Sequence, residues 1–167
     1  MRNILKASTI ESKFPLLAVE HGCIVSKDAD ITVAYRVELP ELFTVTSAEY
    51  EAIHAAWCKA VKVLPEYCIV HKQDWFIRER YCPQTGDHTC YLFLTKTTKE
   101  RMRMQSNFTT LCRGNIIPKE VNEEAAMKFM EAVDQFERIL NDSGFISIAR
   151  LSGDEVTGTS ERPGLLE

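Results

Sequence analysis

The chain contains 167 residues, of which 45% are hydrophobic and 26% charged, and its formal net charge is −4. This length and composition are typical of one globular domain with its own core, and they exclude a disordered or fibrous chain. Because the net charge is negative, no overall basic field attracts nucleic acid, and direct nucleic-acid binding is not expected. The six cysteines include no C-x-x-C pair, which indicates buried reduced thiols rather than a disulfide scaffold or a redox motif.

The sequence contains no apolar stretch long enough to span a membrane, and its first residues lack the apolar segment of a signal peptide. We therefore expect a cytoplasmic protein without a membrane span. Any association with the inner membrane is expected to be peripheral and to depend on partner proteins.

The first predicted elements are a hairpin and a strand. Two short apolar runs flank His21 and Gly22, an arrangement typical of a β-hairpin. Residues 31–39 then alternate apolar and polar side chains, and this period of two predicts a strand with one apolar face. Pro40 ends the predicted strand, since proline has no N–H group to donate to a neighbouring strand. The apolar face consists of Ile31, Val33, Tyr35, Val37 and Leu39.

A helix is predicted to begin after Thr46. Thr46 and Glu49 have the spacing of a capping box, in which the threonine hydroxyl accepts a hydrogen bond from the backbone N–H of Glu49. Apolar residues then recur every three or four positions, which places them on one face of the helix, and Pro65 ends it. The residues of this face are Tyr50, Ile53, Trp57, Ala60 and Leu64.

A long hairpin is predicted next. Residues 67–81 are rich in apolar and aromatic side chains and predict one long strand. A turn at 83–87 and a second apolar run at 90–94 complete a hairpin that extends over residues 67–95.

The last predicted elements are a helix and a short strand. The helix runs from about Glu123 to Leu140, with Asn122 as its N-cap, and Gly144 is suited to the left-handed conformation that follows a helix. Residues 145–150 predict the final strand. The apolar face of the helix consists of Ala126, Phe129, Val133, Phe136 and Leu140.

Apart from the N-terminal hairpin, the predicted order is β-α-β-β-α-β. This order is typical of an α+β fold with a ferredoxin-like antiparallel sheet and two helices on one face. Residues 1–150 are expected to form a single domain. Residues 151–167 have little periodicity and contain proline and glycine, and we expect them to lead toward a further domain.

The sequence contains none of the glycine-rich patterns that mark common catalytic sites. It has no G-x-x-x-x-G-K-[ST] phosphate loop, no G-x-G-x-x-G fingerprint and no G-x-S-x-G elbow. Asp154 and Glu155 follow an apolar run, as an acidic metal-binding pair does, but without a phosphate loop we interpret this likeness as chance. No catalytic residue and no cofactor-binding residue are therefore predicted in this chain.

Two sets of cysteine and histidine residues are candidates for metal binding. His54 and Cys58 lie four residues apart on the predicted first helix, and Cys82, His88 and Cys90 lie around the predicted turn. Structural zinc needs four converging ligands, and these spacings match no common zinc framework. The alternative interpretation is packed thiols and surface imidazoles, so no metal site is predicted.

One basic segment is a candidate interaction surface. Lys96, Lys99, Arg101 and Arg103 lie close together in the sequence with apolar residues between them. Such a segment could contact a DNA backbone, or it could be a solvated extension or a contact with another subunit. The acidic net charge favours a solvated extension or a contact with another subunit over DNA binding.

Aromatic residues of the long hairpin suggest a second candidate surface. Trp75, Phe76 and Tyr81 could form a platform on which bases stack. Acidic neighbours such as Asp74 and Glu79 oppose the binding of a polyanion there, and core packing is the favoured interpretation.

Several segments resemble the N-terminal region of the TraG family of conjugative transposon ATPases from Bacteroides-type mobile elements, which are relatives of the ATPases of type IV secretion. These segments are Phe14-Pro15-Leu16-Leu17, Glu20-His21-Gly22, Asp74-Trp75-Phe76-Ile77, Tyr91 to Glu100, Leu111-Cys112-Arg113-Gly114 and Gly158 to Leu165. Relatives of this kind have a longer polar and aromatic insertion where only Cys82 to Asp87 connects the two strands here.

The resemblance implies a parent protein that couples ATP hydrolysis to conjugative DNA transfer. ATP and magnesium would bind in an ATPase domain after Glu167, and this chain would be a non-catalytic interaction and assembly domain. Its implied partners are its own ATPase domain and other subunits of the conjugation apparatus, with a homo-oligomer possible. Two alternatives remain open: a stand-alone ferredoxin-like module that binds a ligand or nucleic acid, and a small metalloenzyme that uses the cysteine and histidine residues.

Overall fold

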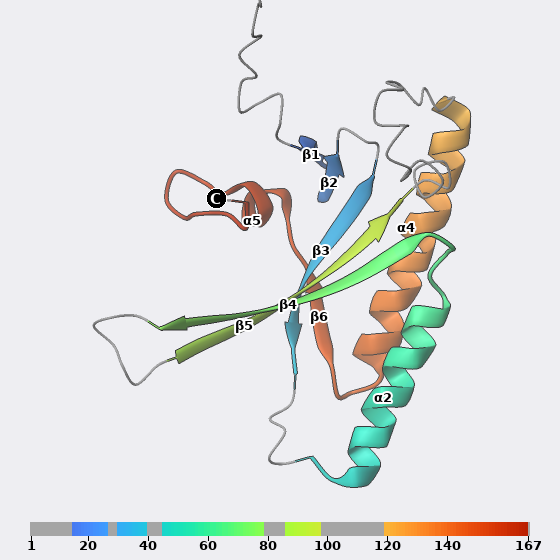
Figure 1. Cartoon of the computed structure of the whole chain (residues 1–167), viewed down its shortest axis with the longest axis vertical. Coiled ribbons are helices and arrows are strands. Elements are labelled where there is room, and N and C mark those ends of the chain that lie inside the picture. The colour runs from blue at the N-terminus through green and yellow to red at the C-terminus, as the bar shows by residue number, and fades with distance from the viewer. Residues whose placement is uncertain (1–14, 27–29, 40–44, 79–85, 98–118, 167) are drawn as a thin grey trace, which may run out of the picture.

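The computed structural model of the chain describes residues 15–26, 30–39, 45–78, 86–97 and 119–166. In these ranges, six strands form one antiparallel sheet, and three helices accompany it (Figure 1). The predicted α+β class is therefore confirmed. The elements are β1 (Leu16–Glu20), β2 (Cys23–Ser26), β3 (Ile31–Glu38), α2 (Ser47–Lys62), β4 (Cys68–Arg78), β5 (Gly86–Lys96), α4 (Lys119–Asp142), β6 (Ser147–Arg150) and α5 (Gly153–Thr157). None of the helices in the described part of the chain is both long enough and apolar enough to cross a membrane.

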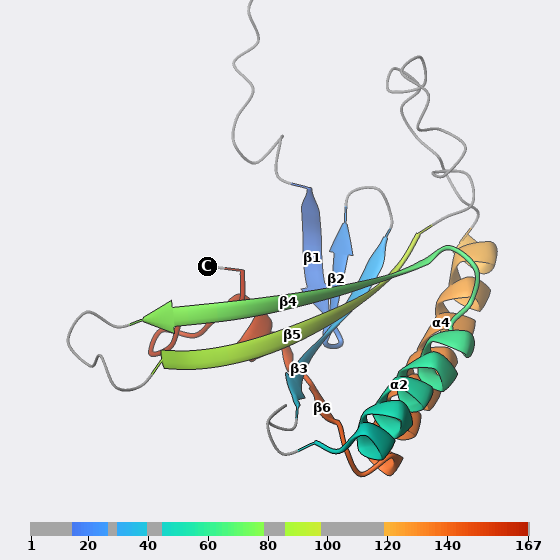
Figure 2. The ribbon, with the colours of Figure 1, turned by 60° about the horizontal axis from the view of Figure 1, so that its bottom comes forward.

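Strand β3 lies at the centre of the sheet. It pairs with β5 along one edge, and β5 pairs in turn with β4. Along its other edge, the first part of β3 pairs with β2, and its last part pairs with β6. Strand β1 completes the sheet beyond β2 through the predicted hairpin at His21 and Gly22, which is confirmed. The long β4–β5 hairpin extends past the helices as an arm (Figure 2).

The larger core lies between the sheet and the pair of helices α2 and α4, which cover the same face. Val33, Tyr35 and Val37 of β3 are buried in it, as the alternation of that strand predicts. The α4 residues Phe129, Val133, Phe136 and Leu140 are all 0% exposed, which confirms most of the predicted apolar face of that helix. Trp57 of α2 packs against Phe136, with 6.2 Å between ring centroids.

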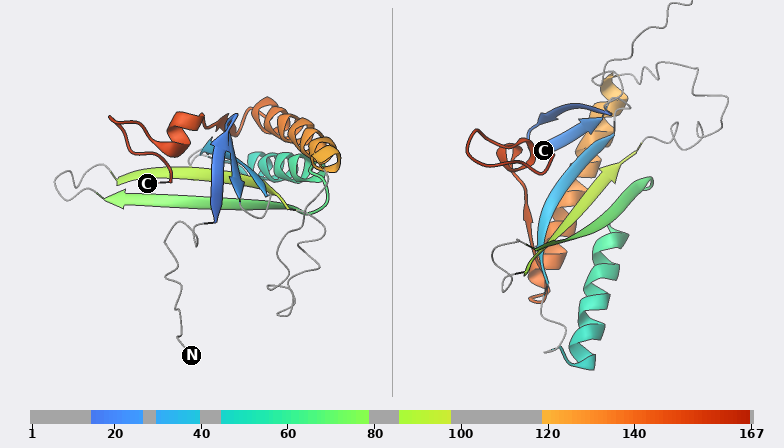
Figure 3. Two further views of the ribbon diagram at one scale, coloured as in Figure 1. Left: turned by 90° about the horizontal axis from the view of Figure 1, so that it is seen from above. Right: turned by 60° about the vertical axis from the view of Figure 1, so that its left-hand side comes forward.

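A smaller core covers the opposite face of the sheet. Ile24, Ala34, Leu151 and Val156 are buried together there, beneath the chain that follows β6 (Figure 3). The prediction of a single apolar face for β3 is therefore incomplete, because Ala34 is only 1% exposed. Leu39, predicted on the main apolar face, is 40% exposed because it lies beyond the end of the strand.

The predicted start of α2 is confirmed. The backbone N–H of Glu49 donates to Thr46 Oγ1 at 3.3 Å, and the N–H of Thr46 donates to Glu49 Oε2 at 2.7 Å. The hydrogen bond from the Thr46 backbone N–H has the largest effect on the Glu49 carboxyl and lowers its pKa, and the bond from the Thr46 hydroxyl lowers it further. The predicted apolar face is wrong at Tyr50, which is 61% exposed, whereas Ala56 is buried. The small Ala56 and Ala60 let α2 approach the neighbouring core closely.

The predicted start of α4 is wrong. The helix begins at Lys119 rather than at Glu123, so Asn122 lies inside the helix and is not its N-cap. The helix ends at Asp142 rather than at Leu140, and the predicted left-handed conformation of Gly144 is confirmed by its φ of 73°.

The long hairpin and the last strand differ in part from the prediction. Strand β4 is described as far as Arg78, and the predicted strand residues 79–81 and most of the predicted turn at 83–87 lie outside the described residues. Strand β5 begins at Gly86, inside the predicted turn, rather than at Cys90. Strand β6 begins at Ser147, because Ile146 is buried in the core before pairing with β3 starts.

Candidate functional site

A cleft of about 470 Å³ lies between the sheet and the chain after β6. Residues 151–166 are called the C-terminal segment here, and this space is called the C-terminal cleft. Its sheet side is the face opposite to α2 and α4. The lining residues are Arg36, Trp75, Thr89 and Tyr91 from the sheet and Asp154, Glu155, Thr159, Arg162, Pro163, Gly164 and Leu165 from the C-terminal segment.

The floor of the cleft is a pair of aromatic side chains. Trp75 of β4 meets Tyr91 of β5 edge-on, with 5.4 Å between ring centroids and 69° between ring planes. The strand register produces this contact, because Trp75 lies opposite Thr89 and Tyr91 is therefore its diagonal neighbour on the same face. Both side chains are half-buried, so part of each ring lines the cleft.

The predicted stacking platform is not assembled as one surface. Neighbouring residues of a strand point to opposite faces, so Phe76 lies on the other side of the arm from Trp75. Phe76 is 79% exposed and stacks on His88, with 4.6 Å between centroids and 18° between ring planes. The favoured interpretation of core packing is therefore wrong for Phe76. Tyr81 lies outside the described residues.

Helix α5 forms one wall of the cleft and is fixed by its own capping box. The N–H of Glu155 donates to Ser152 Oγ at 3.3 Å, and the N–H of Ser152 donates to Glu155 Oε2 at 2.9 Å. Glu155 Oε1 also lies 3.5 Å from the Arg36 guanidinium on β3. The hydrogen bond from the Ser152 backbone, followed by that from its hydroxyl, lowers the pKa of the Glu155 carboxyl. The capping box therefore fixes the N-terminal end of α5, and the Arg36–Glu155 ion pair joins this end to the sheet.

The rest of the roof turns back over α5. The N–H of Leu165 donates to the Glu155 carbonyl at 3.0 Å, and the N–H of Leu166 donates to the Val156 carbonyl at 3.1 Å. Gly164 lies so close to this helix that a Cβ at its position would be 2.1 Å from the backbone nitrogen of Gly158. Only glycine fits such an approach, so the roof depends on the residue type at this position.

Two charged side chains remain at the rim. Asp154 and Arg162 are exposed and line the cleft, and neither forms a salt bridge with another residue in the described ranges. Arg36 is engaged with Glu155. The cleft therefore combines an apolar aromatic floor with one carboxylate and one guanidinium at its edge, a combination typical of binding sites for amphipathic ligands.

Sequence reasoning missed this site, although the sequence contained signals for it. The S-x-x-E spacing of Ser152 and Glu155 is the same capping-box pattern that identified the start of α2. Gly158, with a φ of 82°, and Gly164 then mark the two tight points of the return. The predicted domain boundary at residue 150 stays a prediction, but the structure shows that the next residues pack on the sheet.

The metal candidates are only partly brought together. Cys58 Sγ lies 3.9 Å from His54 Nδ1 and 3.8 Å from Nε2, on the exposed side of α2. His88 Nε2 lies 3.0 Å from Asp74 Oδ1 and Cys90 is buried, whereas Cys82 lies outside the described residues. Within the described ranges, no group of three or more potential ligands converges.

The candidate basic surface is described only at its first residue. Lys96 is 9% exposed, and burial lowers the pKa of its ammonium group. It therefore lies against the fold rather than on an open surface. Lys99, Arg101 and Arg103 lie outside the described residues, so a surface formed by them stays a prediction.

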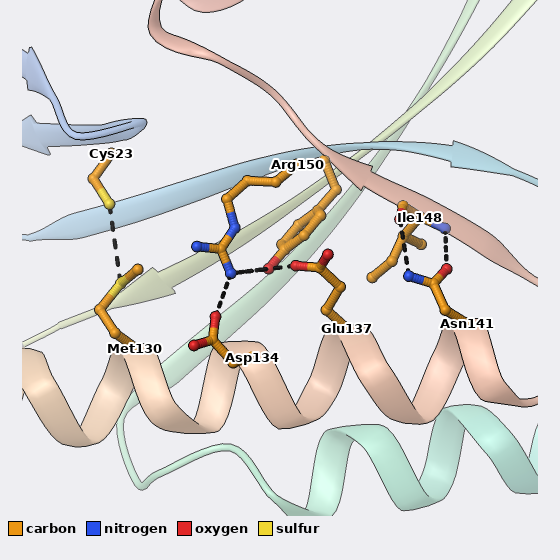
Figure 4. Close-up of polar contacts among 8 residues, drawn as sticks. Cys23, Met130, Asp134, Glu137, Asn141, Ile148 and Arg150 are labelled. Carbon is orange, nitrogen blue, oxygen red and sulfur yellow. Dashed lines mark hydrogen bonds and ion pairs between the residues drawn. The ribbon is translucent and has the colours of Figure 1, made fainter.

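A polar cluster ties α4 to the sheet on the face that α4 covers (Figure 4). Arg150 Nη2 of β6 lies 2.6 Å from Asp134 Oδ1 and 3.2 Å from Glu137 Oε2, and it donates to the Tyr35 hydroxyl at 3.4 Å. Tyr35 is 0% exposed, and burial raises the pKa of its phenol above the ordinary value. We interpret this cluster as a structural connection, because its members join three elements and border no described cavity.

Further contacts extend the same connection along α4. The Asn141 side chain donates to the Ile148 carbonyl at 3.1 Å and accepts from the Ile148 N–H at 2.8 Å. Toward the other end of the helix, Cys23 Sγ lies 4.0 Å from Met130 Sδ. The Asn141 contacts fix the first part of β6, and Arg150 fixes its last residue, after which the C-terminal segment leaves the sheet.

Comparison with known proteins gives one family match. A family described as "Domain of unknown function, B. Theta Gene description (DUF3875)" matches residues 3–55. This range includes β1 to β3 and the first part of α2, and it contributes Arg36 to the C-terminal cleft. A comparison with curated proteins gave no match.

Proposed function

We propose that this chain is a non-catalytic interaction domain in the N-terminal region of a TraG-type conjugation ATPase, and that the C-terminal cleft binds a segment of a partner protein. The observation that carries the proposal is the Trp75–Tyr91 floor beneath the C-terminal segment. Half-buried aromatic pairs in a concave site provide a large apolar contact area at a small cost in side-chain entropy.

The chemistry of the rim favours a peptide over a polyanion. Glu155 is paired with Arg36, and Asp154 and Arg162 carry opposite charges, so the rim has no net positive charge to attract a phosphate backbone. Arg162 and Asp154 together suit a peptide, which offers carbonyl and N–H groups around an apolar or aromatic side chain. The proposed occupant is therefore a short segment with one apolar anchor residue that inserts against Trp75 and Tyr91.

The resemblance to the TraG family supports the placement of this domain in a conjugation ATPase. Three of the segments that carry the resemblance also supply residues of the cleft: Asp74 to Ile77, Tyr91 to Glu100, and Gly158 to Leu165. In this proposal, ATP and magnesium bind in a separate domain of the parent protein. The present domain positions that motor against the conjugation channel, on the cytoplasmic side of the inner membrane and through protein partners.

The same proposal extends to the fold. We propose a ferredoxin-like core, and the pairing order β6–β3–β5–β4, with α2 between β3 and β4 and α4 between β5 and β6, supports this proposal. We infer that this unit is the core of the domain. The β1–β2 hairpin and the C-terminal segment are additions that extend its edge and cover its second face.

A second candidate function is the binding of a small molecule in the same cleft. The volume of about 470 Å³ lies within the range of small-ligand pockets, which supports this alternative. The two ligands would contact different parts of the cleft, because a peptide contacts the rim at Asp154 and Arg162 as well as the aromatic floor.

A random peptide display library, selected on the immobilised domain, tests the proposal. We expect enriched peptides that share one aromatic or aliphatic position and whose binding is lost in Trp75→Ala and in Gly164→Ala. Tyr50→Ala is the matched control, since Tyr50 is an exposed aromatic residue on α2, away from the cleft. Enriched peptides that bind Trp75→Ala as well as the unmodified domain would contradict the proposal. Peptides that need Trp75 but tolerate reversal of Asp154 and Arg162 would favour the small-molecule alternative.

A further inference from the structure

Strand β4 is a long edge of the sheet. It has 11 residues and, within the described residues, pairs only with β5 (Figure 3). Its apolar side chains are well exposed for a strand: Ile69 is 50% exposed, Val70 is 38% exposed and Phe76 is 79% exposed. A long edge with exposed apolar residues is a surface on which another strand can pair, because its outward N–H and C=O groups have no neighbouring strand.

We propose that β4 pairs with β4 of a second copy of this chain, antiparallel and centred on Gln73, to form a two-fold symmetric dimer with one continuous sheet. This inference does not rest on the proposed function of the C-terminal cleft, with which β4 shares only Trp75. The partner is identified by the sequence of the strand itself, which is complementary to its own reverse around Gln73. A two-fold axis through a pair of strands brings each residue opposite its mirror position in the other copy.

The charges of the strand fit this register. With Gln73 at the centre, Lys72 lies opposite Asp74 of the partner subunit, and the two-fold axis makes this contact twice. Lys72 and Asp74 already form an ion pair within one copy. In the dimer, the four groups would alternate in sign around the axis, and opposite charges in cross-strand positions stabilise a sheet.

The apolar residues fit the same register. Val70 lies opposite Phe76 of the partner subunit, so the most exposed aromatic residue of the arm gains an apolar neighbour on the same face. His71 lies opposite Trp75 of the partner subunit on the other face. Aromatic and β-branched pairs are among the most favourable cross-strand neighbours.

Neighbouring registers are unfavourable. In a symmetric antiparallel pair, residues of the same face lie opposite each other only when the two-fold axis passes through a residue position, not between two residues. The two neighbouring registers are therefore centred on Lys72 and on Asp74. Centring on Lys72 places two ammonium groups opposite each other, and centring on Asp74 does the same with two carboxylates. Like charges directly opposite destabilise a sheet, so the charge pattern selects the register centred on Gln73.

Sedimentation equilibrium of the purified chain tests the proposal. We expect a concentration-dependent dimer that is lost in Lys72→Asp and in Asp74→Lys, because each change places like charges opposite each other. The double variant Lys72→Asp/Asp74→Lys exchanges the two signs and is expected to dimerise again. Lys59→Asp, an exposed charge reversal on α2, is the control and is expected to leave the dimer intact. A monomer at every concentration, or a dimer that either single variant leaves unchanged, would overturn the proposal.

Cross-linking gives an independent readout of the register. Gln73→Cys places two identical residues opposite each other across the axis, at a Cα separation that a disulfide can bridge. In a Cys58→Ser background, which removes an exposed thiol, mild oxidation should yield a covalent dimer from Gln73→Cys. Lys59→Cys in the same background should remain uncross-linked. Efficient cross-linking of the control together with none at position 73 would contradict the pairing of β4 with itself.

Discussion

Substitution of Val156 by alanine tests how firmly the C-terminal segment is held on the sheet. Val156 is 0% exposed and packs with Ile24, Ala34 and Leu151 in the smaller core. Full burial of a valine side chain is worth about 1.5–3 kcal/mol, and alanine retains only part of this, so Val156→Ala should cost about 2 kcal/mol once the resulting cavity is included. Loss of this contact should make the segment detach more often.

Four backbone hydrogen bonds inside the C-terminal segment report its opening, because a five-residue helix is not stable once it leaves the sheet. Their donors are the N–H groups of Val156 (3.1 Å to the Ser152 carbonyl), Gly158 (2.9 Å to Asp154), Leu165 (3.0 Å to Glu155) and Leu166 (3.1 Å to Val156). A change of about 2 kcal/mol in the opening free energy corresponds to about thirtyfold faster hydrogen exchange at these amides. Amides outside the C-terminal segment that exchange through other local openings should show a smaller change in their exchange rates.

The exchange rates are measured by nuclear magnetic resonance, with Val133→Ala as the matched control. Val133 is also 0% exposed but lies in the larger core beneath α4. The control should lower the free energy of global unfolding by a similar amount while leaving the opening of the C-terminal segment unchanged. Equal exchange of the four amides in Val156→Ala and the unmodified chain would refute the account of how this segment is held.

Three further predictions concern stability, the cleft and a half-buried thiol. Arg150→Ala removes the hydrogen bonds that join β6 to α4 and should lower the free energy of unfolding by about 2 kcal/mol. Lys128→Ala breaks only an exposed ion pair with Glu124 and should have a clearly smaller effect. Urea denaturation compares the two variants, and equal losses of stability would contradict the role of the cluster. Gly164→Ala should displace the roof of the cleft, because the added Cβ would lie 2.1 Å from a backbone nitrogen, and unchanged tryptophan fluorescence and unchanged peptide binding would contradict this. Burial raises the pKa of the Cys68 thiol from 9.0 to about 11, so at pH 8 its alkylation should be much slower than that of the exposed Cys58 and should rise steeply toward pH 11. Because the folded state holds the proton more tightly, the stability contributed by this thiol is fully present below pH 9 and is lost as pH rises toward 11; a pH-independent alkylation rate would contradict this prediction.

The elements that the sequence predicts best are those with a strong local pattern. The alternation around Tyr35, the capping box at Thr46 and the glycine after α4 each depend on neighbouring residues only, and all three are confirmed. The start of α4 was wrong because Asn122 is a good N-cap residue by type but is preceded by residues that are already helical. At Asn122, the preference of asparagine for the N-cap position is therefore outweighed by the helix that already began at Lys119.

The candidate site was harder to predict because it depends on contacts between distant segments. Trp75 and Tyr91 meet only through the register of β4 and β5, and Phe76 is separated from them by the pleat of the strand. The C-terminal segment has little periodicity because only Leu151, Val156 and part of Leu165 face the sheet, too few to produce a repeat. The sequence pattern therefore did not predict that this segment covers the sheet, and the prediction that it leads toward a further domain stays a prediction.

The most direct test of the central claim is the frequency of conjugative DNA transfer from cells whose full-length parent protein carries a substitution in the cleft. Trp75→Ala and Gly164→Ala should each reduce transfer at least tenfold while the amount of parent protein stays unchanged, and Tyr50→Ala should transfer normally. Such a result would show that the cleft is needed for the operation of the channel. Normal transfer with Trp75→Ala and Gly164→Ala, at equal protein levels, would contradict the proposed function.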